Sequence, residues 1–202
     1  MGQLAHPLPR RSNKMSSHHI VREKQEPALL IMNLDGFDSE YLGQLLEWSP
    51  TVIVTESVYE QADSMGIKVD GIITNNGQFY AQEHTRLIPF EADVLEDALK
   101  FLVAEAYPAV NIIDSKFLLK DYALFVDLIN LVIYNPGKKI FPVKTGFSKW
   151  VVAGEKVEMM HDINHLEVQG LRQLKPYRFE TEKDGFYSLA FHQPFIFIAE
   201  EL

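Results

Sequence analysis

The chain has 202 residues, of which 47% are hydrophobic and 23% are charged, which is ordinary for a soluble protein of one larger domain or two small ones. Its formal net charge of −9 argues against nucleic-acid and anionic-membrane partners, because both require a basic protein surface. The absence of cysteine excludes disulfides, thiolate zinc sites and cysteine nucleophiles, and it fits a cytoplasmic location. No apolar run approaches the ~20 residues that span a bilayer.

Residues 15–136 are expected to form a mostly parallel, Rossmann-like α/β domain, because short apolar runs alternate with amphipathic segments. The basic residues 1–14 precede this domain and are interpreted as a flexible tail. Asp38 or Ser39 suits the N-cap of the first helix, and Gly66 suits the position after the end of the second. We expect strands at 28–33, 51–55, 70–74, 85–90 and 109–113, and helices at 38–48, 57–65, 91–106 and 120–134.

The pattern changes after the turn Asn135-Pro136-Gly137, which we take as the boundary between two domains. Beyond it, short β-type segments alternate with turns that contain glycine or proline, a pattern typical of a sandwich or barrel. We therefore expect an all-β sandwich domain over residues 137–202. Its predicted strands lie in KIFPV, FSKWVVA, HLEVQG, PYRFE, GFYSLAF and PFIFIAE.

The usual glycine-rich phosphate motifs are missing, since neither Gly-x-Gly-x-x-Gly nor Gly-x4-Gly-Lys-Ser/Thr occurs. His161 and His165 have a spacing that would suit a metal site on a helix, but they lie in a β-type segment and are better explained as solvated side chains. Carboxylates remain as candidates for binding a metal or phosphate. They lie near predicted strand ends (Asp35, Glu56 and Asp114) and at the start of the 91–106 helix (Glu91, Asp93 and Asp97), where complementing the helix dipole is the simpler explanation.

Six blocks of sequence, in the same order, carry a resemblance to one family: SSHHIVREKQEPALLI (16–31), LGQLLEWSP (42–50), GIKVD (66–70), LEDALKFL (95–102), AVNII (109–113) and DGFYSLAF (184–191). With them, nearly the whole chain from Met15 resembles the thiamine pyrophosphokinases, particularly the Bacteroidetes branch. The resemblance implies an α/β nucleotide-binding domain followed by a thiamine-binding-type β-sandwich, usually in a homodimer. It also implies transfer of pyrophosphate from ATP to thiamine with Mg²⁺.

The functional motifs of that family are largely replaced in this chain. The family's Gly-Asp-Phe-Asp, which serves metal and phosphate, falls on Thr74, Asn75, Asn76 and Gly77, where no carboxylate is left. A lysine of the family falls on Asp97, which inverts the charge beside the phosphates. An Asp-Gly pair of the family falls on Glu56 and Ser57, and the acid of its Thr-Asp falls on Asp93. A Ser-Asn pair begins at Arg178. Of the family's Gly-x-Arg-x-Asp-His, this chain keeps the acid, Asp121.

These replacements lead to three hypotheses. The first is a folded paralogue without catalysis, which binds thiamine or a nucleotide or has a regulatory role. The second is an active pyrophosphotransferase with relocated acids, namely Glu56, Asp93, Asp97 and Asp121. The third is a purely structural or dimer-interaction role, with the pocket collapsed around Phe117, Leu118 and Phe125. Asp121 is the candidate catalytic residue, no metal site is assigned, and the candidate ligand-pocket residues are Asp35, Glu56, Ser57, Asn75, Asn76, Gly77, Asp93, Asp97 and Arg178.

Overall fold

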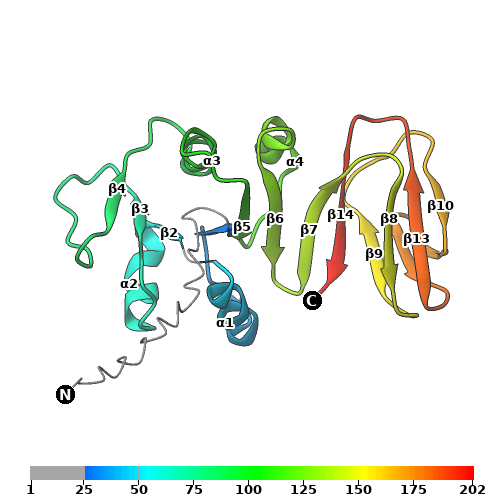
Figure 1. Cartoon of the computed structure of the whole chain (residues 1–202), viewed down its shortest axis with the longest axis horizontal. Coiled ribbons are helices and arrows are strands. Elements are labelled where there is room, and N and C mark those ends of the chain that lie inside the picture. Colours follow the sequence, from blue (N-terminus) through cyan, green and yellow to red (C-terminus); the bar gives the residue numbers. More distant parts are fainter. Residues whose placement is uncertain (1–25, 50) are drawn as a thin grey trace, which may run out of the picture.

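The structure is a computed structural model that describes residues 26–49 and 51–202 (Figure 1). The predicted flexible tail, residues 1–14, lies outside the described residues. Two β-sheets form the framework of the described part, one of eleven strands and one of three. The fold class is therefore α/β, with a large mixed sheet and a small second sheet.

Six parallel strands make up one half of the large sheet, in the order β4-β3-β2-β1-β5-β6. The central strands are short and fully buried, as expected for a parallel sheet that is covered on both faces. Their bounds confirm the predicted strands to within a few residues: β1 Ala28–Ile31, β2 Val52–Thr55, β3 Gly71–Ile73, β4 Arg86–Ile88, β5 Ala109–Ile113 and, beyond the predicted set, β6 Asn130–Asn135.

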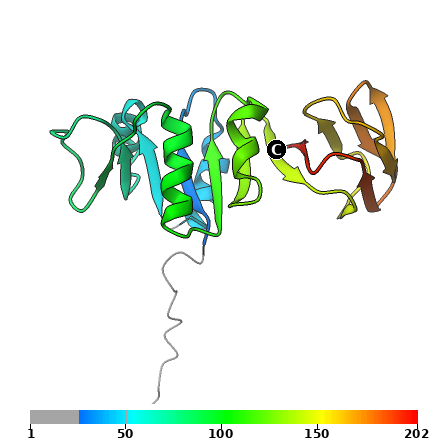
Figure 2. The same ribbon diagram turned by 90° about the horizontal axis from the view of Figure 1, so that it is seen from above.

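Helices cover both faces of these parallel strands (Figures 1 and 2). On one face lie α1 (Ser39–Glu47) and α2 (Glu56–Ser64), and on the other lie α3 (Val94–Ala104) and the short α4 (Leu119–Tyr122). The predicted N-cap of the first helix is confirmed, because the Asp38 carboxylate accepts backbone N–H groups of α1 at 2.8 and 3.1 Å.

The pairing of β6 with β7 (Lys138–Val143) joins the parallel half of the large sheet to an antiparallel half. The two strands form a hairpin whose turn is Pro136-Gly137. Beyond β7 the order continues with β14 (Ile196–Glu201), β9 (Lys156–Met159), β12 (Arg178–Thr181) and β11 (Leu171–Lys175). The large sheet is therefore continuous across the expected domain boundary, and the division into domains at 136/137 stays a prediction.

The small sheet packs on the antiparallel half of the large one. Its strands are β10 (Glu167–Gln169), β13 (Gly185–Ala190) and β8 (Phe147–Val151), in that order. Leu189 of the small sheet shares one hydrophobic core with Ile196 and Ile198 of β14. The alternate residue of β14, Phe197, lies in the core that contains α4, so the two cores occupy opposite faces of the large sheet.

One predicted helix is wrong, that over residues 120–134. The helical structure there ends after α4 and a single 3₁₀ turn, η1 (Ala123–Phe125), and the chain enters β6 at Asn130. Leu124 and Leu128 have helical spacing, but both are exposed rather than part of a buried helix face. The run NLVIYN instead pairs with β5, because its β-branched and aromatic residues favour a strand. Strands β9 and β11 were also not predicted.

In the described part of the chain, no helix is long and apolar enough to cross a membrane.

Gly137 is needed for the hairpin that joins the two halves of the sheet, because its φ of +74° is strained for any other residue. We expect Gly137→Ala to lower the free energy of unfolding by about 1 kcal/mol. The measurement is urea denaturation of the full chain. The matched control is Gly43→Ala in the exposed interior of α1, which should instead raise the free energy of unfolding by up to about 1 kcal/mol. Equal effects of the two substitutions would contradict this account of the turn.

Candidate functional site

Most of the predicted site residues lie in loops at the carboxyl edge of the parallel strands, where open α/β sheets bind ligands. Five short segments contribute, and each follows a strand or begins the helix after it. They are Asp35 after β1, Glu56 and Ser57 at the start of α2, Asn75 to Gly77 after β3, Asp93 and Asp97 at the start of α3, and Asp121 in α4. The remaining candidate, Arg178, begins β12 in the antiparallel half and faces Glu158, with Nη2 and Oε1 3.5 Å apart.

Glu56, the acid after β2, accepts a hydrogen bond from a side chain at the end of β3. Glu56 Oε2 accepts a hydrogen bond from the hydroxyl of Thr74, which is buried at the end of β3. Beside them, the Ser57 and Thr55 hydroxyl oxygens form a hydrogen bond of 3.0 Å. Glu56 therefore ties the ends of β2 and β3 together, whereas the Ser57 bond stays within the junction of β2 and α2.

The loop after β3 uses its asparagine amides to hold its own backbone. Asn75 Oδ1 accepts the N–H of Phe90 at 3.0 Å, which fixes the loop to the segment after β4. Asn76 Oδ1 accepts the N–H of Gln78 at 3.1 Å, the pattern of an Asx-turn. Gly77 completes the exposed turn. Asn75, the amide that stands at the first carboxylate of the family's motif, is thus already bonded to the segment after β4.

The two acids before and within α3 stabilise the start of that helix. Asp93 is its N-cap and accepts the N–H of Glu96 at 2.8 Å. Asp97 Oδ2 accepts the N–H groups of Glu91 and Ala92 at 2.7 and 3.3 Å, and these bonds hold the pKa of Asp97 below its ordinary value. Asp93 therefore stabilises the start of α3 as its N-cap, and Asp97 holds the segment before the helix; that these acids complement the helix dipole stays a prediction.

Asp35 is likewise part of a local turn. Its backbone N–H donates to Asn33 Oδ1 at 2.6 Å, and its Oδ2 accepts from Asn33 Nδ2 at 3.1 Å. The side chain is exposed and forms no hydrogen bond with another loop in the described part of the chain, so the structure does not bring it into a cluster with Glu56 or Asp121.

A second group of acids lies where β5 meets α4. Burial raises the pKa of Asp114, and the nearby charge of Asp121 raises it further. The same two charges act on Tyr122, whose pKa is raised mainly by burial. The Tyr122 hydroxyl is buried and has no hydrogen-bond partner among the described residues. Sequence reasoning had placed Asp114 at a strand end, but nothing in the sequence marked Tyr122.

The aromatic packing beside this group agrees only in part with the collapsed pocket that the third hypothesis expects. Phe117 stacks on Tyr122, with ring centroids 5.5 Å apart, and Phe125 is buried in the same core. Leu118, by contrast, is 53% exposed. The inclusion of Leu118 in that packing is therefore wrong.

The two aspartates of the family's Gly-Asp-Phe-Asp motif, which serve Mg²⁺ and phosphate, have no counterpart in the loop after β3. Mg²⁺ favours carboxylate oxygens as ligands. Within residues 26–49 and 51–202, no group of three or more histidine, aspartate or glutamate side chains is arranged to hold a metal ion. Hydrogen bonds from Thr74 or from backbone N–H groups are accepted by Glu56, Asn75, Asn76 and Asp97.

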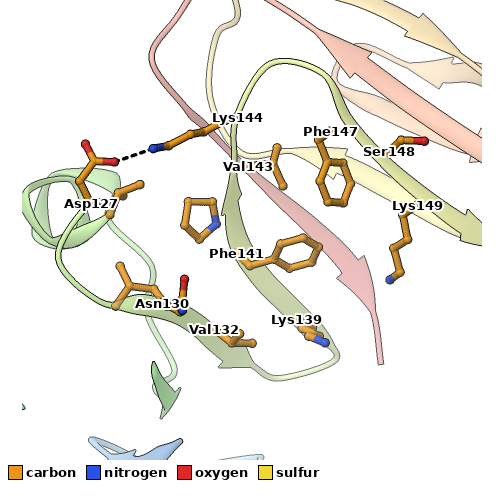
Figure 3. Close-up of a pocket in the computed structure, with 13 residues that line it drawn as sticks. Asp127, Asn130, Val132, Lys139, Phe141, Val143, Lys144, Phe147, Ser148 and Lys149 are labelled. Carbon is orange, nitrogen blue, oxygen red and sulfur yellow. Dashed lines mark hydrogen bonds and ion pairs between the residues drawn. The ribbon is translucent and has the colours of Figure 1, made fainter. Parts of the chain in front are cut away.

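Sequence reasoning missed a cavity of about 590 Å³ on the face of β6 and β7 (Figure 3). It contains none of the predicted site residues. Its lining comes from β6, β7, β8 and the segment between η1 and β6. No motif marks it, because its residues meet only after β8 has folded over β7.

Comparison with known proteins shows what kind of fold this is. No family model matches the sequence, and the search of the curated proteins also found no match. Among solved structures, the thiamin pyrophosphokinase of Geobacillus thermodenitrificans has a TM-score of 0.61 and is 8% identical, covering 87% of this chain and 97% of that one. The thiamin pyrophosphokinase of Candida albicans has a TM-score of 0.61 and is 10% identical, covering 88% of this chain and 89% of that one. The yeast enzyme has a TM-score of 0.60 and is 7% identical, covering 89% of this chain and 87% of that one.

These likenesses extend over most of each chain and show that the protein has an α/β fold with a second β-layer. That fold is the fold of the thiamin pyrophosphokinases, which confirms the resemblance seen in the sequence at the level of structure.

The role of Asp97 at the start of α3 predicts a pH-dependent effect on stability. Because its pKa is lowered in the folded state, its contribution is present above the ordinary value of 3.8 and is lost as the pH falls through the lower, folded-state pKa. We expect Asp97→Asn to lower the thermal midpoint at pH 7, and the difference from wild type to shrink as the pH falls through the folded-state pKa of Asp97. Glu182→Gln is the control, since that exposed side chain accepts no hydrogen bond from a described residue. A difference that is constant with pH would contradict the role of the Asp97 charge.

The unpartnered hydroxyl of Tyr122 predicts that its removal is favourable. A buried polar group without a partner costs roughly 1–3 kcal/mol, so we expect Tyr122→Phe to raise the free energy of unfolding by about 1 kcal/mol. Tyr187→Phe is the matched control, because the equally buried Tyr187 hydroxyl donates to Glu200 at 3.2 Å and its loss should be destabilising. Chemical denaturation measures both. Destabilisation by both substitutions would show that Tyr122 has a partner.

Proposed function

We propose that this protein is a divergent relative of the thiamine pyrophosphokinases that keeps their fold without pyrophosphoryl transfer and acts as a ligand-binding or regulatory protein. One observation carries the proposal. At the carboxyl edge, the side chains that replace the family's metal and phosphate residues are used to hold the protein's own loops together, as the bonds of Asn75, Asn76 and Asp97 show most clearly.

The electrostatics of the edge support the same conclusion. In the enzymes that the sequence resembles, Mg²⁺ offsets the charge of ATP beside acidic residues. Here the remaining acids, among them Glu56, Asp93 and Asp121, surround loops whose metal-binding carboxylates are absent. Lys100, the cation on the first turns of α3, is already paired with Glu96 at 2.8 Å and with Asp97 at 3.3 Å. A triphosphate would therefore meet like charges around these acids, and the cations left to offset them lie after β5, at the exposed Lys116 and Lys120.

An active pyrophosphotransferase is the second candidate, and one observation favours it. Asp114 and Asp121 are close enough for the charge of one to raise the pKa of the other, at the end of a central strand. Two neighbouring carboxylates are the minimal apparatus for holding a divalent cation near a phosphate. In this hypothesis Asp121, the acid kept from the family's motif, is the catalytic residue.

The test is an assay of the full chain with thiamine, ATP and Mg²⁺, in which AMP and thiamine diphosphate are measured. We expect neither product above the protein-free blank. Steady formation of both would overturn the proposal. The variant Asp121→Asn then identifies the site, because loss of that activity would establish the relocated-acid mechanism.

The ligand and the assembly belong to the same proposal. Thiamine or a nucleotide, bound with or without Mg²⁺, is the expected ligand, and a homodimer in the cytoplasm is the expected form. A thermal-shift comparison of thiamine, its phosphates and nucleotides addresses the ligand, and sedimentation velocity of the full chain addresses the homodimer.

A further inference from the structure

The cavity in Figure 3 lies apart from the carboxyl edge of the parallel strands. It runs along β6 from Asn130, at the amino end of that strand, and faces β7 and β8. A ligand bound in this cavity would be independent of the proposed function, because the cavity is a different surface and is present in an active or an inactive protein.

The floor of the cavity is apolar and aromatic. The rings of Phe141 on β7 and Phe147 on β8 meet edge to face, with centroids 6.1 Å apart, and Val132 and Val143 line the space beside them. Figure 3 shows these side chains around one hollow. The volume of about 590 Å³ lies within the range of pockets that bind small molecules, roughly 300–1,000 Å³.

The rim of the cavity is basic. Three lysines and a single aspartate line it, in a chain whose net charge is −9. The ammonium groups of Lys139 and Lys149 lie 5.8 and 6.0 Å from the centroid of the Phe141 ring. The third lysine, Lys144, is paired with Asp127 at 2.8 Å.

The charges of Lys139 and Lys149 are not balanced equally. Both carboxylate oxygens of Glu200 lie 2.6 Å from Lys149 Nζ, and Glu200 also accepts a hydrogen bond from the Tyr187 hydroxyl. Lys139 is the cross-strand neighbour of Glu200, but its side chain makes no hydrogen bond or ion pair with any residue in the described part of the chain. One ammonium group therefore faces the aromatic floor without an anionic partner.

The geometry points to a binding site for a small aromatic anion, a planar ring that carries a carboxylate, sulfonate or phosphate. The ring would pack against Phe141 and Phe147, and the anionic group would face Lys139 and the neighbouring Lys149. A cationic molecule such as thiamine does not suit this rim, because like charges repel at short range.

The test uses two fluorescent probes of similar size, the anionic 1-anilinonaphthalene-8-sulfonate and the neutral N-phenyl-1-naphthylamine. We expect the full chain to bind the anionic probe more tightly, and Lys139→Met to weaken its binding about tenfold while leaving the neutral probe unchanged. The matched control is Lys183→Met, an exposed lysine outside the cavity, which should change neither. Equal effects of the two lysine variants on the anionic probe would overturn the inference.

Methyl NMR of the wild-type chain locates the bound probe. We expect the anionic probe to shift the methyl signals of Val132 and Val143, which line the cavity. Shifts confined to the exposed Val152, beside the exposed rings of Trp150 and Phe186 on the small sheet, would place the probe elsewhere and overturn the assignment.

Discussion

The structure depends on the pairing of β6 with β7. Three cross-strand pairs and the turn at Pro136-Gly137 turn a parallel sheet into an antiparallel one without a break in the sheet. Everything that follows in the chain is built on β7: β14 pairs with it, β9 pairs with β14, and the small sheet packs on the same layer. The pairing also leaves one stretch of sheet face only partly covered, and the cavity lies there.

The two candidate regions differ in how their polar groups are satisfied. At the carboxyl edge, acids and amides accept hydrogen bonds from nearby N–H groups and from Thr74, so the loops hold one another. At the cavity, Lys139 faces an aromatic floor without an anion, although Lys149 and Lys144 beside it are paired. The fold of the thiamin pyrophosphokinases is thus combined with a carboxyl edge whose loops are hydrogen-bonded to one another and with a lysine-lined cavity on another face.

The sequence revealed the elements that carry local signals. Asp38 is a helix N-cap and marked the start of α1, and short β-branched runs marked the central strands, whereas the N-cap role of Asp93 was not predicted. The sequence wrongly predicted a helix before β6, because Leu124 and Leu128 have helical spacing although both are exposed. It could not show the cavity, because Phe141 and Phe147 lie on strands of different sheets and alternate with residues that face elsewhere. The unpartnered hydroxyl of Tyr122 likewise depends on packing against distant residues, which periodicity does not encode.

The central claim is that the carboxyl edge does not hold a divalent cation with ATP. It is tested most directly by electron paramagnetic resonance of Mn²⁺, as a substitute for Mg²⁺, mixed with ATP and the full chain. The account predicts the spectrum of Mn²⁺ and ATP without protein. A protein-bound Mn²⁺ signal that Glu56→Gln or Asp121→Asn abolishes would contradict it.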